Sequence, residues 1–217
     1  AEGFGKISSG IQQLTEAESA RPLHITMTPS FAIGWLMPRL PLFREAHPEV
    51  ELMVNPTVNV VSLADAGYDL AIRFGRGPWP GLESVPLIST NFTIVAAPKL
   101  LEGRDISSPG DLLDLPWLQE YGTQEVVDWL ATRGVVLPKM ARVTDLPGYM
   151  LLPALRDGQG VGAAARMFLD GDIEDGRLVA LFEESDEKSP TAYHLVWRPG
   201  IQRPALKAFI RWIRRAA

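Results

Sequence analysis

Histidine, cysteine and serine most often carry nucleophilic or metal chemistry, and here they form no recognisable catalytic pattern. The 217-residue chain has no cysteine, which excludes disulfides, thiolate metal sites and thiol catalysis. Its three histidines, His24, His47 and His194, are scattered and lack the spacing of a zinc motif. There is no G-x-S-x-G nucleophile elbow, and no pair of carboxylates can be placed as acid and base. The sequence therefore predicts neither an enzyme nor a metal or cofactor site.

One glycine cluster looks like a nucleotide-binding motif. Gly158, Gly160 and Gly162, followed by Ala163, match the dinucleotide pattern G-x-G-x-x-[GA]. That motif binds a dinucleotide where it follows a strand and opens a helix. Here it closes a predicted helix and enters a predicted strand. It is therefore interpreted as a helix stop.

Hydroxyl groups cluster where the first predicted strand meets the first predicted helix, in Thr28-Pro29-Ser30-Phe31. Free backbone N–H groups at a helix start attract anions, and Thr28 or Ser30 can add a side-chain hydroxyl. The same hydroxyls are also common helix caps. We expect a cap here and, in addition, a ligand contact.

Polar residues also end the next two predicted strands. Asn55 and Thr57 follow the second strand, where the alternative to a ligand contact is a plain turn. Arg73, with Phe74 beside it, ends the third strand, and a guanidinium can bind a carboxylate or phosphate through two hydrogen bonds. Arg73 could equally be structural, pairing with Asp69 or with a loop carbonyl.

The second half of the chain offers a similar set of residues. Thr144 and Asp145 end a strand just before a helix, and Tyr121 follows another short strand. Asp145 could accept a hydrogen bond from an amine, which would suit an amino acid or a peptide. The alternative is that Asp145 caps the next helix.

These residues are separated by alternating strand and helix patterns. Such alternation predicts an α/β fold built from βαβ units with mostly parallel sheets, and the strand count suggests two small sheets. In parallel sheets, ligands collect at the carboxyl ends of the strands. The predicted strands are 23–27, 50–54, 68–74, 85–88, 92–97, 117–119, 141–143, 161–165, 178–182 and 193–197. The predicted helices are 31–47 (kinked or restarted at its prolines), 58–66, 124–132, 149–156 and 205–215.

The composition is that of an ordinary globular protein, with 46% hydrophobic and 22% charged residues. The formal charge of −5 argues against a bare nucleic-acid-binding domain. No apolar run approaches the roughly 20 residues that span a bilayer, and the first residues do not form a signal peptide. Ile7, Ile11 and Leu14 form a short apolar stripe, which predicts the end of a helix that begins upstream.

Several stretches, taken in order, resemble one family. They are LHITMTPSFA at 23–32, AGYDLAIRFG at 66–75, GRGPWPGL at 75–82, SPGDL at 108–112 and LRDGQGVG at 155–162. Together they are similar to the effector-binding domain of LysR-type transcriptional regulators. The loop at 75–82 resembles the subgroup typified by regulators of glycine cleavage and of β-lactamase.

This resemblance implies a type 2 periplasmic-binding-protein fold, with two Rossmann-like lobes joined by two crossover strands. Lobe I would hold residues 23–97 plus 193–217, lobe II would hold 98–192, and residues 1–22 would end a linker helix. A small-molecule effector would sit between the lobes, and the family position matching Ser30 commonly touches it. The expected effector contacts are Thr28, Pro29, Ser30, Phe31, Asn55, Thr57, Arg73, Phe74, Tyr121, Thr144 and Asp145.

The resemblance also implies partners. We expect a cytoplasmic homodimer, tetrameric in the full-length protein, that binds DNA through an N-terminal domain absent from this sequence and does not bind membranes. The subgroup suggests an amino acid or a cell-wall fragment as effector. The alternative is a periplasmic solute-binding protein of a transporter, which would share the fold.

Overall fold

The computed structural model describes residues 21–136, 138, 142–182 and 192–217. The chain forms two compact units. Among the described residues, the first unit holds 21–27, 37–88 and 192–217, and the second holds 28–36, 89–136, 138 and 142–182. The predicted end of a linker helix, residues 1–22, lies outside the described residues except for its last two positions.

The first unit is built on a five-stranded sheet. Its strand order is β2-β1-β3-β10-β4, formed by β2 (Leu52–Pro56), β1 (Leu23–Met27), β3 (Leu70–Gly75), β10 (Ala192–Trp197) and β4 (Glu83–Ser89). Strand β1 runs parallel to β2 and to β3, whereas β10 runs antiparallel to β3. The carboxyl ends of β1, β2 and β3 therefore meet at one edge of this sheet.

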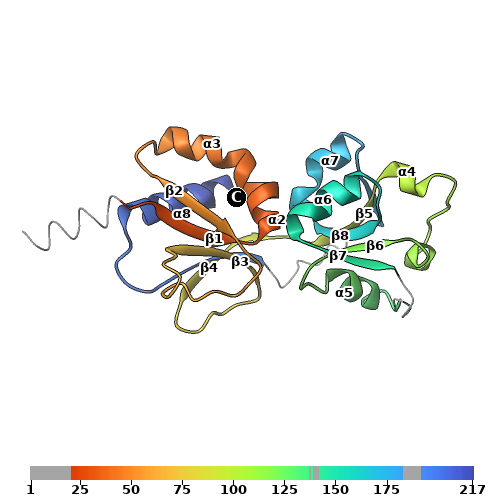
Figure 1. The fold of residues 1–217 in the computed structure, drawn as a ribbon, viewed down its shortest axis with the longest axis horizontal. Helices are drawn as coiled ribbons and strands as arrows, with labels where there is room; N and C mark the ends of the chain where they lie inside the picture. Colours follow the sequence, from red (N-terminus) through yellow and green to blue (C-terminus); the bar gives the residue numbers. More distant parts are fainter. Residues whose placement is uncertain (1–20, 137, 139–141, 183–191) are drawn as a thin grey trace, which may run out of the picture. The chain divides into compact units, whose positions relative to one another are not determined.

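Two helices pack together on this sheet: α3 (Met37–Ala46) and α8 (Pro204–Ala216) (Figure 1). Phe43 of α3 and Phe209 of α8 are fully buried, and their ring centroids lie 5.1 Å apart in an edge-on arrangement. Leu206, Phe209 and Ile213 of α8 are all buried. This contact fixes both helices against the sheet.

The second unit has a sheet of its own. Its order is β7-β6-β8-β5-β9, formed by β7 (Val143–Leu146), β6 (Trp117–Glu120), β8 (Val161–Ala165), β5 (Phe92–Ala96) and β9 (Val179–Leu181). Strand β6 is parallel to β7 and β8, but β5 is antiparallel to β8 and β9. Both sheets are thus mixed, which corrects the prediction of mostly parallel sheets. The antiparallel strands β5 and β10 are the strands at which the chain enters one unit from the other. No helical crossover within their own sheet precedes them.

Helices cover both faces of the second sheet (Figure 1). Successive strand residues point to opposite faces, so Trp117 of β6 packs with helix α5 (Glu125–Ala131), whereas Leu118 packs with helix α6 (Gly148–Arg156). Shorter helical segments complete the unit: α4 (Pro98–Leu101), η2 (Pro109–Leu112), η3 (Arg166–Phe168) and α7 (Asp170–Glu174).

The helical segment after β1 also belongs, by its contacts, to the second unit. It consists of α2 (Pro29–Phe31) and the π-helical η1 (Ala32–Leu36), which leads directly into α3. Gly34 of η1 lies so close to Phe168 that a Cβ atom would approach its ring carbons at 2.7 Å. The expected irregularity of this helix is a π-helical stretch just before Pro38, and α3 then continues past Pro41.

Two sequence predictions differ from the structure. Residues 58–66 form turns and no helix, because Thr57 and Ser62 hydroxyls accept hydrogen bonds from the backbone N–H groups of Asn59 and Asp65. Such local bonds compete with helix formation. In addition, β5 pairs within the second sheet, although the predicted first lobe extended to Ala97.

Candidate functional site

The carboxyl end of β6 brings together residues that are far apart in sequence. Glu120 is the last residue of β6, and Ser30 is the second residue of α2. The Ser30 hydroxyl donates a hydrogen bond of 2.6 Å to Oε2 of Glu120, across 90 residues of sequence. This edge, where β6 and its parallel neighbours end, is the position at which α/β sheets bind ligands.

The start of α6 lies against the same pair. Gly148, the first residue of α6, is buried, and a Cβ atom there would collide with the Glu120 carboxylate and the Ser30 hydroxyl. Only glycine permits this close approach. The preceding residue, Pro147, gives α6 no side-chain cap. The Glu120 carboxylate therefore lies at a helix N-terminus, where the helix dipole favours negative charge.

Burial perturbs the acidic groups near this edge. Burial raises the pKa of Glu120, and the nearby charge of Glu125 raises it further, against the opposing effect of the Ser30 hydrogen bond. Burial likewise raises the pKa of Glu125 at the start of α5. Glu120 therefore carries its charge in a setting that is only partly solvated.

A second polar pair occupies the opposite face of the sheet at this edge. Gln119 Nε2 donates a 3.2 Å hydrogen bond to Oδ1 of Asp145, in the register in which β6 pairs with β7. Gln119 is 8% exposed, and its Oε1 atom is buried without a hydrogen-bond partner. The predicted residues Thr144 and Tyr121 are exposed beside this pair.

The turn before α2 is capped as expected. Thr28 Oγ1 accepts a hydrogen bond of 3.4 Å from Phe31 N, and Pro29 takes the first helical position. The Phe31 side chain is fully buried and stacks on Trp35, with ring centroids 5.1 Å apart. Phe31 thus lies in the core, whereas Ser30 lies at the strand edge. Effector contacts by residues 28–31 remain a prediction.

In the first unit, Arg73 links the ends of three parallel strands. Its guanidinium donates to the backbone carbonyl of Thr57 at 2.6 Å and to Thr26 Oγ1 at 3.2 Å. Asn55 Nδ2 donates to the Tyr68 hydroxyl at 2.6 Å. Burial lowers the pKa of Arg73. Of the two structural alternatives for Arg73, pairing with a loop carbonyl is the one that the structure contains.

The other alternative, an ion pair between Arg73 and Asp69, does not form, because Asp69 pairs with other residues. Asp69 accepts hydrogen bonds from Arg21 at 2.7 Å, from Arg203 at 2.7 Å and from the backbone N–H of His24 at 2.9 Å. Asp69 therefore stabilises the first unit and does not orient Arg73.

The predicted residue Phe74 lies beside Tyr193 of the neighbouring strand, with ring centroids 5.1 Å apart.

The structure gathers the predicted site residues into two separate sets. Asn55, Thr57 and Arg73 meet at the carboxyl edge of the first sheet, whereas Ser30 and Asp145 lie at that of the second. Sequence reasoning missed Glu120 and Gln119. A signal was present, because this polar pair ends the otherwise apolar β6. However, the sequence could not show that Ser30 would reach Glu120.

The glycine cluster at 158–162 has a structural explanation. Gly158, with φ of +65°, ends α6, and its N–H donates to the carbonyl of Leu155. A Cβ on Gly160 or Gly162 would come within 2.7 Å of a backbone carbonyl of the 116–118 segment. The cluster thus closes a helix and enters β8, as expected. Among the described residues, no group of three histidine, aspartate or glutamate side chains is placed to hold a metal ion.

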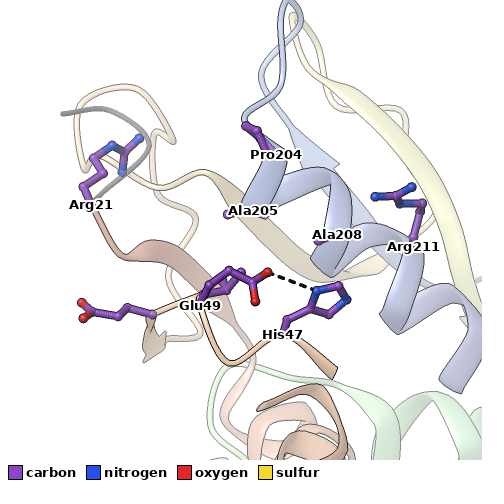
Figure 2. A pocket seen from close by; sticks show the side chains of 9 residues that line it. Arg21, His47, Glu49, Pro204, Ala205, Ala208 and Arg211 are labelled. Carbon is purple, nitrogen blue, oxygen red and sulfur yellow. Dashed lines mark ion pairs between the residues drawn. The ribbon is translucent and has the colours of Figure 1, made fainter. Parts of the chain in front are cut away.

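A surface hollow of about 370 Å³ lies elsewhere in the first unit (Figure 2). It is bordered by the first turns of α8 and by residues 47–51, where His47 Nδ1 and Glu49 Oε1 are 3.5 Å apart. Arg21 and Arg211 also border it. The hollow contains none of the predicted site residues. The strand edges therefore remain the better candidate site.

Comparison with known proteins identifies the family. The family model described as "LysR substrate binding domain" matches residues 16–217. HvrB of Rhodobacter capsulatus, an AhcY transcriptional activator, is 37% identical over all of this chain and 74% of its own length. The glycine cleavage system transcriptional activator of Escherichia coli is 31% identical over 98% of this chain and 70% of its own length.

A solved structure agrees with these relatives. The effector domain of the regulator AmpR of Pseudomonas aeruginosa superposes with a TM-score of 0.75 at 29% identity, covering 90% of this chain and 94% of that domain. The resemblance seen in the sequence, including its subgroup, and the two-lobed α/β fold that it implied are thereby confirmed. The chain belongs to the LysR substrate-binding domain family and is the effector-sensing domain of a LysR-type transcriptional regulator.

Proposed function

We propose that the chain binds a small polar effector at the carboxyl edges of its sheets, with Ser30 as a central contact. The observation that carries this proposal is the convergence of Ser30, Glu120 and the start of α6 at one strand edge. A hydroxyl, a carboxylate and a helix N-terminus from three distant segments provide polar groups of different kinds. A ligand is fixed in its binding site by a small number of oriented polar groups of this kind.

The proposed effector is an amino acid or a cell-wall fragment. This class follows from the subgroup of regulators that the loop at 75–82 resembles. The other predicted contacts are Thr28, Pro29, Phe31, Asn55, Thr57, Arg73, Phe74, Tyr121, Thr144 and Asp145. We further propose that the chain is not an enzyme, since its relatives are regulators. A role as a transporter's solute-binding protein is not favoured by them.

We place the protein in the cytoplasm, because a transcriptional regulator acts on the chromosome, and we expect DNA binding through a domain outside this sequence. In the described part of the chain, no helix is both long and apolar enough to cross a membrane. We also expect a homodimer, tetrameric in the full-length protein. Leu42 on α3 and Tyr149 on α6 are large side chains that are 61% and 53% exposed, which supports these helices as pairing surfaces. A monomeric mass at high concentration would contradict the pairing.

A thermal-shift screen tests effector binding. The wild-type chain is mixed with amino acids, muropeptides, aromatic acids and nucleotide sugars. A ligand at 100 times its Kd adds about 2.7 kcal/mol to the free energy of unfolding if it binds only the folded state. We expect one chemical class to raise the melting temperature, and we expect Ser30→Ala and Thr144→Ala to abolish that increase.

Ser62→Ala is the matched control. Ser62 is an exposed serine of the first unit that accepts a local hydrogen bond from Asp65 N, so its variant should respond like the wild type. The proposal fails if every class leaves the melting temperature unchanged. It also fails if the increase persists in both Ser30→Ala and Thr144→Ala.

A further inference from the structure

Carboxylate acceptors lie on both faces of the second sheet at its carboxyl edge, with Glu120 on the Ser30 side and Asp145 on the other. Glu120 and Asp145 are acceptors when ionised, and each receives a hydrogen bond from one side chain of this edge, Ser30 or Gln119. Each carboxylate therefore keeps acceptor capacity beyond the one side-chain hydrogen bond that it receives.

The buried amide of Gln119 is oriented by Asp145. A carboxylate can only accept, so the amide nitrogen of Gln119 must face Asp145 and its oxygen must point away. That Oε1 atom is buried and has no partner, in a side chain that is more than nine-tenths buried. Buried polar atoms without partners are uncommon in folded proteins. Because Gln119 and Glu120 point to opposite faces of β6, this oxygen does not face Ser30, and Glu120 is the acceptor that a donor ligand would meet beside the Ser30 hydroxyl.

The charges near Ser30 also favour a cationic ligand group. Glu120 is half-buried and remains reachable from solvent, and Glu125 lies near enough to interact with it electrostatically. Arg166, the first residue after β8 at this edge, is already paired with Asp170 at 3.0 Å. An anion placed beside Ser30 would meet the Glu120 carboxylate, whereas a cation would find an opposite charge that is only partly hydrated.

We propose that Glu120 selects effectors that carry a primary ammonium group, which binds its carboxylate beside the Ser30 hydroxyl. This inference rests on the proposed function and specifies the ligand class of the same site. Glu120 acts as a specificity-determining residue: it favours a free amine and disfavours an effector that presents only a carboxylate at this position.

The test uses matched probes. Each standard amino acid is offered to the wild-type chain as the free amino acid, its amide, its N-acetyl derivative and its N-acetyl amide, and binding is measured by calorimetry. We expect the free-amine forms of at least one amino acid to bind, and N-acetylation to abolish binding. Glu120→Gln should weaken the amine forms by about tenfold or more, because a hydrogen bond to a charged group is lost.

The control is Glu102→Gln, an exposed carboxylate at the end of α4 in the same unit, which should bind like the wild type. Circular dichroism and melting temperature show whether Glu120→Gln is folded. The inference is overturned if N-acetylated forms bind as well as free amines. It is also overturned if Glu120→Gln leaves amine binding unchanged, or if no amine form binds at millimolar concentration. Ser30-dependent binding of a compound without an amine would retain the proposed function while rejecting this inference.

Discussion

Glu120 is a half-buried carboxyl group at the end of β6, and its pKa is raised by burial and by the nearby charge of Glu125. The folded protein therefore takes up a proton at Glu120 more readily than the unfolded chain. The contribution of this group to stability is fully present below its ordinary pKa of 4.5 and is lost as the pH rises through the raised pKa. Above the raised pKa, the ionised group lowers the stability of the fold relative to its protonated form.

We expect Glu120→Gln to remove this pH dependence while leaving Ser30 a hydrogen-bond acceptor. The melting temperature of the variant, relative to the wild type, should become more positive as the pH is raised from about 4 to 8. Thermal unfolding followed by circular dichroism across this range measures the difference. Glu102→Gln, which changes an exposed carboxylate at the end of α4, is measured beside it as the matched control. A Glu120→Gln difference that is largest at acid pH would contradict the account.

Ion pairs of very different burial tie α7 to its surroundings. Asp172 of α7 has a side chain that is 2% exposed, and it accepts hydrogen bonds from Arg156 of α6 at 2.7 Å and from Arg177 at 2.6 Å. Burial alone would raise the pKa of Asp172, but these two arginines outweigh it, so the pKa is lowered. By contrast, Asp170 of the same helix is 62% exposed and pairs with Arg166 at 3.0 Å.

Replacing the buried Asp172 by alanine should therefore lower the free energy of unfolding much more than replacing the exposed Asp170. We expect Asp172→Ala to lower the free energy of unfolding by about 2 kcal/mol. The variant loses a buried carboxylate that accepts hydrogen bonds from two arginines, while both arginines can still reach water. Asp170→Ala should change it by less than about 0.5 kcal/mol. Urea unfolding of the two variants measures this contrast, and equal losses would show that burial does not set the strength of these pairs.

At the level of elements, the sequence predicts what depends on local pattern and misses what depends on pairing. Strands β1 and β8 begin and end where expected, because their short apolar runs are bounded by polar or turn residues. The helix predicted over residues 58–66 was wrong, because the hydroxyls of Thr57 and Ser62 accept hydrogen bonds from nearby backbone N–H groups. Ser30 was found through its place at a helix start, but its bond to Glu120 depends on tertiary packing.

The whole molecule is two units with separate hydrophobic cores. In the first unit, Phe43 is fully buried and contacts the rings of Phe209 and Trp212. In the second, Leu155 is fully buried in a cluster with Val95 and Leu118. Because each sheet is covered by helices of its own unit, a cavity in one core removes contacts from that unit and leaves the other core intact.

We therefore expect Phe43→Ala and Leu155→Ala to have reciprocal effects on local opening. Each should destabilise its own core by about 2–5 kcal/mol, and regions that open below the global unfolding free energy exchange their amide hydrogens first. In hydrogen-exchange mass spectrometry, Phe43→Ala should accelerate exchange mainly in β1, β3, β10 and α8, and Leu155→Ala mainly in β6, β8 and α6. Uniform acceleration of both units by either variant would mean that the two cores open as one cooperative structure. Added effector would then be expected to protect both units together, because a ligand that binds only the folded state stabilises every region that must open with its site.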